Sequence, residues 1–310
     1  MKLGIVVVYL FGEPNAPLLD LHLSQIEKHT QVPYTIYGSV NRLAAPYRQK
    51  LEKQRRVQVC ECPATELRGG EEHAFYLDHL VEMAIQDGAS HLVCLHLDSF
   101  PIRPGWAREL AGRLSPTCVL ATIERISTAC LFFHRDFFLQ HRPTFRLPVD
   151  ERAGSQYKAY IREWDPLQHT GVGYGFEAYS EGLSWYYLKP STEVTDPNTF
   201  GRIYDDLVFH LRGATFLGER PAPRLGILRE RSYGSLIDKA YRTTSAIIPV
   251  RAREFLKAHF RTPIEQLIHR PRAGTQRPQL ELARQQLLKD PEVYLDQLRT
   301  HRMQTGMPPD

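Results

Sequence analysis

The fold of this chain is indicated most clearly by the stretch His91-Leu92-Val93-Cys94-Leu95-His96-Leu97-Asp98-Ser99-Phe100-Pro101. A continuous apolar run of this kind is typical of a strand buried on both faces of a parallel sheet. The run ends at Asp98, and the carboxyl ends of such strands form the edge of an α/β sheet at which ligands bind. Asp98 is therefore either a binding residue or an ordinary cap of the proline-containing turn that follows. Turn chemistry alone favours the cap.

Strand and helix signals alternate on both sides of this stretch. The clearest helix is predicted between Glu71 and Asp87, because its apolar residues recur at helical spacing and Gly88 is well placed to end it. The other predicted strands are residues 3–10, 34–37, 57–60, 119–122 and 129–133. This alternation is typical of an α/β fold with a mainly parallel sheet flanked by helices.

The second half of the chain has a different pattern. After Pro143 the sequence predicts glycine-containing loops and short helical pieces, and beyond about Leu225 it predicts helices separated by prolines. The last helix, residues 279–299, is interrupted at Asp290-Pro291, which would more naturally start a second helix. We therefore expect an α/β domain over residues 1–220 and a helical C-terminal extension over residues 221–310.

Charge divides the chain at the same place. The extension holds 16 Lys and Arg against 9 Asp and Glu, whereas residues 1–220 hold 23 against 26. A basic extension is either simply solvated or meets phosphate groups. Between Tyr241 and Phe260, basic and apolar residues alternate as in a helix lying on an anionic membrane, and this pattern suits equally a helix packed on the body or on a second subunit. Packing is the default expectation, and nucleic acid is not an expected partner, because aromatic residues are too sparse among the basic ones.

Composition excludes several classes of protein. With 42% hydrophobic and 24% charged residues, the chain resembles an ordinary soluble globular protein rather than a disordered one. No apolar run reaches the roughly 18–20 residues of a membrane-spanning helix. The N-terminal run has no small-residue cleavage site, so a cytoplasmic location is expected. The five cysteines contain no C-x-x-C pair and are expected to be reduced, mostly buried thiols.

The residues around Asp98 resemble a motif of a known family. His96-Leu97-Asp98-Ser99-Phe100-Pro101 is similar to the D-x-D-x-F-P pattern of family 2-like GT-A glycosyltransferases, with His96 in place of the first Asp. Residues 21–30 and 34–39 resemble the opening of the same enzymes. The resemblance implies a GT-A-like fold in which His96 and Asp98 bind the nucleotide sugar and Asp98 contacts the metal. In the alternative register Asp98 is the first Asp and Phe100 takes the second place, and either register leaves one carboxylate.

Three later stretches extend the resemblance over roughly the first 215 residues. Residues 128–135 resemble the strand that these enzymes use beside the acceptor site. Residues 169–175 resemble their glycine-containing loop, which implies that Gly171 and Gly173 bind the nucleotide sugar. Residues 203–213 resemble a late strand ending in a histidine, which implies that His210 completes the metal or diphosphate site. A histidine at the end of an apolar strand is more often a structural residue.

A basic residue near the start of the clearest helix is a further candidate for the nucleotide sugar. Arg68 precedes Gly69-Gly70, and the backbone N–H groups of a glycine turn at a helix start can hold phosphate. Arg68 would then help to neutralise the diphosphate, although Glu71 and Glu72 compete for the same donors. A charged helix cap explains this stretch about as well.

Sugar transfer with inversion needs a carboxylate that takes the proton of the acceptor. Glu163 and Asp165 flank Trp164 just before the glycine stretch, and Glu177 lies just after it, where the resemblance implies that the base is placed. Asp165 and Glu177 are the preferred candidates. For any one of these three carboxylates, a solvated loop position is the commoner role.

The expected function is the transfer of a sugar from a nucleotide-sugar donor to a glycan or lipid-linked acceptor, in the assembly of a polysaccharide or another glycoconjugate. A divalent cation, Mn²⁺ or Mg²⁺, held by Asp98 and His210, is the expected cofactor. Peripheral contact with the inner face of the membrane and a homo-oligomer are compatible expectations. A catalytically silent module that binds a nucleotide or a partner stays open, because the first Asp of the motif is absent. A nucleotidyltransferase is a weaker alternative, since no Gly-rich basic loop follows the first strand.

Overall fold

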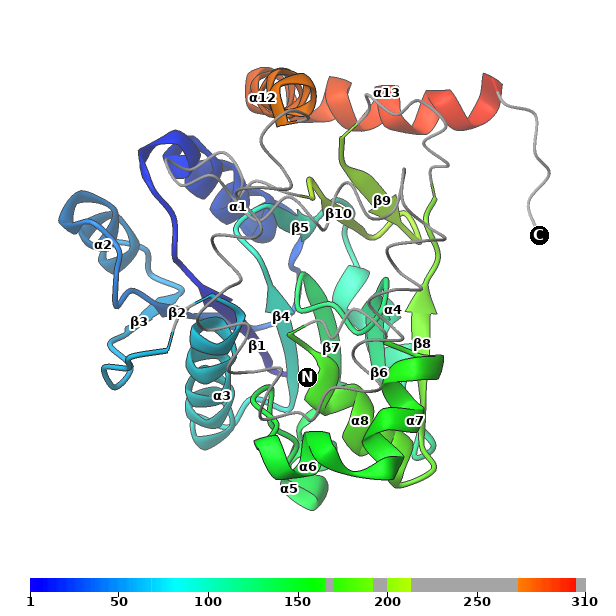
Figure 1. Ribbon diagram of the computed structural model, residues 1–310. Coiled ribbons are helices and arrows are strands. Elements are labelled where there is room, and N and C mark those ends of the chain that lie inside the picture. The colour runs from blue at the N-terminus through cyan, green and yellow to red at the C-terminus, as the bar shows by residue number, and fades with distance from the viewer. Residues whose placement is uncertain (68, 166–169, 192–199, 213–272, 305–310) are drawn as a thin grey trace.

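A seven-stranded sheet forms the centre of the protein, in the order β3-β2-β1-β4-β7-β6-β8 (Figure 1). The computed structural model describes residues 1–67, 69–165, 170–191, 200–212 and 273–304. The strands of the sheet are β1 Leu3–Val8, β2 Tyr34–Ser39, β3 Val57–Cys60, β4 His91–Leu95, β6 Cys118–Ile123, β7 Cys130–His134 and β8 Ser184–Leu188. Neighbouring strands run parallel except at β7, which is antiparallel to both β4 and β6. The predicted α/β class with a mostly parallel sheet is confirmed.

Helices cover both faces of the sheet. One face packs against α1 Ala16–His29, α2 Ala45–Glu52 and α4 Trp106–Gly112. The other face packs against α3 Gly70–Gln86, α5 Arg135–His141 and α8 Val172–Ser180. The remaining short helices are η1 Glu13–Asn15, α6 Val149–Ala153 and α7 Ser155–Glu163. Two faces covered by apolar helices explain why the central strands read as continuous hydrophobic runs.

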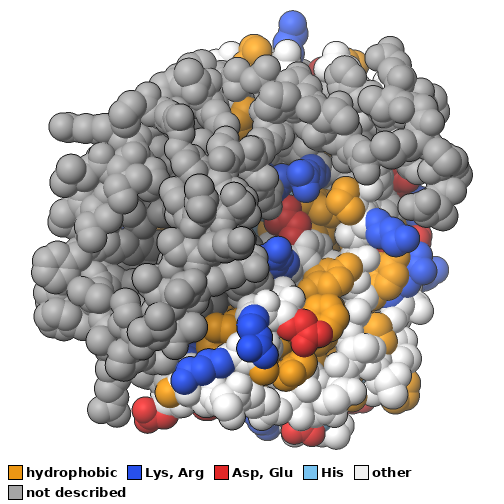
Figure 2. Space-filling view, turned by 45° about the vertical axis from the view of Figure 1, so that its right-hand side comes forward, with side chains coloured by type: hydrophobic (Ala, Val, Ile, Leu, Met, Phe, Trp, Pro, Cys, Tyr) orange, Lys and Arg blue, Asp and Glu red, His pale blue; other side chains and the backbone are white. Residues whose placement is uncertain are grey.

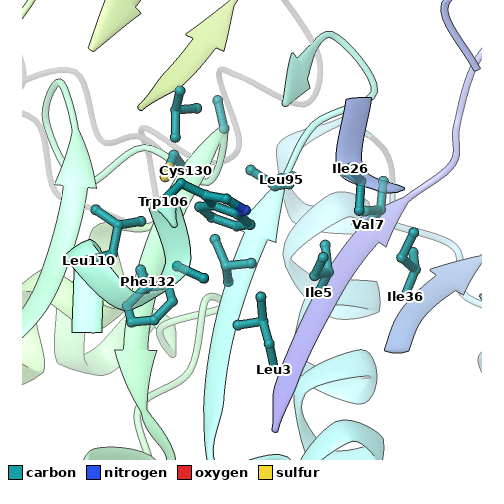
Figure 3. Packing of buried hydrophobic residues seen from close by; sticks show 14 of the residues in the cluster. Leu3, Ile5, Val7, Ile26, Ile36, Leu95, Trp106, Leu110, Cys130 and Phe132 are labelled. Atoms are coloured by element: carbon teal, nitrogen blue, oxygen red, sulfur yellow. The ribbon is translucent and has the colours of Figure 1, made fainter. Parts of the chain in front are cut away.

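Successive side chains of each central strand point to opposite faces of the sheet and so enter different cores. Ile5 and Val7 of β1 point to the α1 side, whereas Val6 points to the α3 side. Figure 3 shows the first core, in which the indole of Trp106 lies beside Leu95. Trp106 is fully buried, and its indole N–H donates to Thr30 Oγ1 at 3.2 Å. Complete burial with a satisfied polar group makes this indole a main contributor to the core, and truncating a buried Trp to Ala typically costs about 3–5 kcal/mol.

A second, three-stranded sheet lies beyond the carboxyl end of β4. It contains β5 Ser99–Pro101, β10 Val208–His210 and β9 Arg202–Tyr204, all antiparallel, and it pairs His210 with Ser99. A late strand ends at His210 as expected, but residues 203–210 are not one continuous strand. The chain instead turns back at Asp205 and Asp206, whose φ angles are 47° and 54°. Aspartate tolerates this left-handed conformation better than most residues, so this pair can form a hairpin turn.

The described C-terminal helices pack on this smaller sheet. They are α12 Ala273–Lys289 and α13 Pro291–Gln304, which break at Asp290 as the sequence predicts. Both lie over α1 and the β9–β10 hairpin (Figure 1), and the Tyr294 hydroxyl donates to the carbonyl of Phe200 at 2.6 Å. In this part of the extension, packing on the body is observed. The stretch Tyr241–Phe260 lies outside the described residues.

The described surface mixes apolar and charged side chains. Figure 2 shows hydrophobic groups beside both basic and acidic ones on the face turned to the viewer. None of the described helices combines the length and apolar character needed to cross a membrane. All five cysteines are free thiols, and four of them are buried, in agreement with the sequence interpretation.

Candidate active site at the carboxyl edge of the sheet

The carboxyl edge of the parallel strands carries a group of polar residues. β4 ends at Leu95, and His96 to Asp98 connect it to β5 of the second sheet. Because β10 is antiparallel to β5, its last residue, His210, comes opposite Ser99. The backbone N–H of Leu211 donates to the carbonyl of Asp98 at 2.9 Å, which fixes the two segments side by side.

His96, Asp98 and His210 lie together at this edge. Each offers a ligand atom, and these atoms all lie within 4.8 Å of one another. The distance from His210 Nε2 to Asp98 Oδ1 is 3.6 Å, and the two side chains are only 11% and 7% exposed. The ring centroids of His96 and His210 are 5.8 Å apart. The structure thus brings together the three residues that the sequence analysis assigned to one site.

The loop between β6 and β7, residues 124–129, supports this group. Thr128 Oγ1 lies 2.9 Å from His96 Nε2, so the two form a hydrogen bond. The Ser99 hydroxyl donates to the carbonyl of Ala129 at 2.6 Å and accepts from the backbone N–H of His96 at 2.8 Å. The β4–β5 turn is therefore held by its own backbone and by the neighbouring loop, which restricts the orientation of His96.

Burial lowers the pKa of three histidines around this edge. It lowers the pKa of His96 to about 4, an effect that Asp98 partly offsets and His210 reinforces. Burial also lowers the pKa of His73, whose ring lies edge-on to His96 at 5.2 Å, to about 3. His22 of α1 is fully buried with a pKa lowered to about 4, and its Nδ1 lies 3.1 Å from the Ser99 carbonyl oxygen. Neutral imidazoles of this kind serve as hydrogen-bond partners or as metal ligands.

A second carboxylate, which the sequence analysis did not identify, lies on the supporting loop. Glu124 Oε1 accepts a hydrogen bond from the Tyr204 hydroxyl at 2.5 Å and forms an ion pair with Arg212 Nε at 3.0 Å. Glu124 and Arg212 both have left-handed backbones, with φ of 51° and 64°. Such strain in non-glycine residues is concentrated at functional sites. The signal that could have found Glu124 is its place directly after the predicted strand at residues 119–122, at the same edge as Asp98.

The donor set fits a divalent cation. His210 Nδ1 is buried and makes no hydrogen bond, which is an unusual state for a polar atom inside a protein. Two imidazoles and one carboxylate are ligand types that hold divalent cations in proteins. His96, Asp98 and His210 therefore form a chemically consistent candidate cation site.

The glycine stretch is a helix rather than a loop, which corrects the sequence interpretation. Gly171 precedes α8, and Gly173 and Gly175 lie within its first turns. A Cβ atom on Gly171 would lie 2.1 Å from the Ile126 carbonyl oxygen, and one on Gly173 would lie 1.8 Å from that of Thr144. These glycines allow α8 to pack against neighbouring backbone, a purely structural reason for their presence. Their assignment to nucleotide-sugar binding stays a prediction.

The three candidate bases lie in different surroundings. Glu163 is exposed at the end of α7, whereas Asp165 is fully buried. Glu177 lies on α8, where its carboxylate is 3.8 Å from the His141 ring on α5 and shares that ring with Glu181. Arg68 lies outside the described residues.

Asp165 is close to the last strand of the sheet. Burial raises the pKa of Tyr187, and the negative charge of Asp165 adds to this effect. Tyr187 pairs with Thr122, one residue before β6 reaches the carboxyl edge. Asp165 is thus the candidate base that lies near the paired strands β6 and β8.

Comparisons with known proteins give fold-level neighbours only. No known protein family and no curated protein matches the sequence. A structure of S. aureus TarS 1–349 in complex with UDP-GlcNAc is similar with a TM-score of 0.36 and 10% identity, over 47% of this chain and 48% of that one. A second structure of S. aureus TarS 1–349 gives a TM-score of 0.38 and 9% identity, over 60% of each chain. The chain therefore spans about half to three fifths of the length of these structures.

Proposed function

We propose that this protein is a glycosyltransferase that moves a sugar from a nucleotide-sugar donor to a glycan or another glycoconjugate. One observation carries the proposal: His96, Asp98 and His210 converge, nearly buried, where the parallel strands end. In open α/β sheets this edge is where nucleotides and other ligands bind. The resemblance of residues 96–101 to a D-x-D-x-F-P motif then identifies the diphosphate of the donor as the ligand that this group suits.

Asp98 and His210 are the residues that would hold a divalent cation, with His96 as a third ligand or as a donor to the diphosphate. When bound, such a cation supplies positive charge that stabilises the departing diphosphate. The residues of the chain fix the geometry, since Thr128 orients His96 and the β5–β10 pairing sets His210 opposite Ser99, next to Asp98. Prior positioning of this kind lowers the cost of aligning the donor for attack.

Asp165 is the proposed base in a reaction that inverts the sugar. It would accept the proton of the attacking acceptor hydroxyl as the new bond forms. Its burial beside Tyr187 supports this assignment over Glu163, which is exposed, and over Glu177, whose carboxylate faces His141. Three further proposals are compatible with this function. The acceptor is lipid-linked, the enzyme acts in polysaccharide assembly, and it works at the inner face of a membrane.

The second candidate function is a catalytically silent module that binds a nucleotide. The observation that favours this module is His96, which stands where the first carboxylate of the motif is expected. Such a module would bind the diphosphate without transferring or hydrolysing the sugar.

Binding of sugar nucleotides is the experiment that tests the proposal. A panel of UDP-, GDP-, TDP-, CDP- and ADP-sugars, each with and without Mn²⁺, is screened for a rise in Tm of the full chain. At least one donor should raise Tm by several degrees, because a ligand at 100 times its Kd stabilises by about 2.7 kcal/mol. Slow release of free sugar from that donor distinguishes the transferase from the silent module. A panel without any shift would refute both.

A further inference from the structure

The three-stranded sheet has one face toward the C-terminal helices and another that carries His210. In antiparallel pairs, directly opposite residues share a face and successive residues alternate between faces. Phe209 is opposite Phe100 on β5 and Ile203 on β9, so these side chains form one row on one face. The row lies in the core that also holds the buried apolar residues of α12 and α13. His210, the next residue of β10, therefore lies on the face away from these helices.

Tyr294 of α13 joins the C-terminal helices to this row. Its side chain is buried, and its ring lies edge-on to that of Phe209, with the ring centroids 6.3 Å apart. Its hydroxyl donates a buried hydrogen bond to the carbonyl of Phe200, two residues before β9, at 2.6 Å. Tyr294 thus contacts the start of one hairpin strand and the middle of the other, so it holds both in place.

The ring of Phe209 has little room to move. Its centroid lies 5.2 Å from that of Phe100, and a Cβ atom added to Gly201 would lie 2.6 Å from the Phe209 ring. Gly201 also has a φ of 87°, so both its backbone and its close approach to the ring favour glycine. A core packed this closely transmits a displacement to its neighbours instead of absorbing it. A change at Tyr294 is therefore expected to reach β10.

The row is connected to the candidate site through β10 itself. Phe209 directly precedes His210, and the Leu211 N–H donates to the Asp98 carbonyl at 2.9 Å. The side chains that meet there are close, with 3.6 Å between His210 Nε2 and Asp98 Oδ1. A small shift of β10 against β5 would change this separation. Tyr294 supports β10 on the face away from the site.

We propose that Tyr294 is a positioning residue for donor binding, which acts through Phe209 on the placement of His210 beside Asp98. The inference rests on the proposed glycosyltransferase function. It gives the C-terminal helices a role at the donor site in addition to their packing on the body. The expected signature is a weaker affinity for the diphosphate in a chain that keeps its fold.

Calorimetric titration of the full chain tests the inference. UDP, GDP, TDP, CDP and ADP are titrated in Mn²⁺, and the diphosphate that binds the wild type most tightly is used for the variants. Tyr294→Leu should lower its affinity about tenfold and leave the number of binding sites per chain unchanged. A merely structural role would instead reduce the number of sites, because part of the chain would be unfolded.

Two further variants calibrate this loss. Tyr294→Phe keeps the ring and removes only the hydrogen bond to Phe200, so its affinity should fall less, by about threefold. Phe138→Leu in α5 is the matched control, an aromatic-to-leucine change in the core on the α3 side of the main sheet. It should change the affinity by less than about twofold, because it shares no partner with Tyr294.

A double-mutant cycle tests the route through Phe209. Phe209→Leu alone should also lower the affinity. The double variant Phe209→Leu/Tyr294→Leu should lose less than the product of the two single losses, because both changes act on one contact. Single losses that simply multiply would overturn the route.

The outcomes separate this inference from the proposed function. Wild-type diphosphate affinity in folded Tyr294→Leu, checked by circular dichroism, would overturn the inference and leave the proposed function standing. If Tyr294→Leu does not fold, Tyr294→Phe decides, and wild-type affinity in that variant overturns the inference. A wild-type chain that binds none of the five diphosphates would refute the proposed function and the inference that rests on it.

Discussion

Two histidine–carboxylate clusters of similar composition lie at different places in this molecule. His96, Asp98 and His210 meet where β4 ends, and His141, Glu177 and Glu181 meet between α5 and α8. Asp98 is 7% exposed, whereas Glu181 is 50% exposed. Two segments, the β4–β5 turn and the end of β10, build the first cluster, and hydrogen bonds from a third, the β6–β7 loop, support it. The second cluster lies between two helices, and its Glu181 faces solvent.

The difference shows that residue types alone do not make a site. Like charges one helical turn apart, such as Glu177 and Glu181, are common on solvated helix faces and cost little there. A carboxylate in a nearly buried position must be balanced by specific partners. The edge cluster is therefore the more buried of the two and has specific hydrogen-bond partners, whereas the helix cluster includes an exposed carboxylate.

The largest expected effect is on the catalytic rate, which should fall for a variant in the edge cluster and change little for one in the helix cluster. Asp98→Asn should reduce the rate of sugar transfer, or of donor hydrolysis, by about a thousandfold or more, because it removes the only carboxylate of the edge cluster. Glu177→Gln should change the rate by less than about threefold. Steady-state kinetics with the donor found by the Tm screen provide the measurement. Comparable losses of rate in both variants would contradict the distinction between the two clusters and would favour Glu177 as the base.

The next effect concerns the helix that carries the second cluster. Gly173→Ala should destabilise the protein by about 3 kcal/mol, because the new Cβ would lie 1.8 Å from the Thr144 carbonyl oxygen. Gly112→Ala in α4, where nothing lies within 4 Å of an added Cβ, should be neutral or stabilise slightly. Urea unfolding of both variants measures the change in the free energy of unfolding. If Gly173→Ala left the free energy of unfolding unchanged, α8 would be loosely packed against its neighbours. Loose packing, rather than exposure, would then distinguish the two clusters.

The smallest effect is a pH dependence that arises at His22, which lies beside the edge cluster at the Ser99 carbonyl. The pKa of His22 is lowered to about 4 by burial, whereas the unfolded chain binds the same proton near its ordinary value of 6.5. Unfolding therefore takes up a proton below pH 6.5, and the stability present at neutral pH is lost as pH falls toward 4. Between pH 6.5 and 5 the loss from this residue should reach up to about 2 kcal/mol. His22→Asn, measured by urea unfolding at both pH values, should show a shallower decline, and an unchanged slope would contradict the assignment.

Local patterns were sufficient to predict much of the fold. The strand at residues 57–60 is β3 as predicted, and the helix predicted from Glu71 to Asp87 is α3, which ends before Gly88 with φ of 79°. Periodicity and helix-ending glycine carry this information within a few residues of sequence. The convergence of Asp98 with His210 was also predicted, because a strand end and a family-like motif pointed to the same edge.

Other features depend on contacts that no local pattern encodes. The antiparallel direction of β7 follows from pairing with β4 and β6, and its sequence resembles any buried strand. Gly171 and Gly173 suggested a loop, yet they are required by the backbone of residues far away in sequence. The link from Glu124 to Arg212 joins segments 88 positions apart, and Glu124 lies in none of the stretches that resemble a known motif.

The packing of α12 and α13 on the β9–β10 hairpin has a consequence for folding during synthesis. The strands β1 to β4 emerge from the ribosome early and pair with near neighbours in sequence, whereas Phe209, next to His210, packs against Tyr294, which emerges much later. Contacts between distant segments form slowly, because the intervening chain must be ordered before they add stability. A nascent chain released before α13 would carry a folded sheet with an incomplete hairpin. Ligand binding at the carboxyl edge would then report that translation has passed that helix.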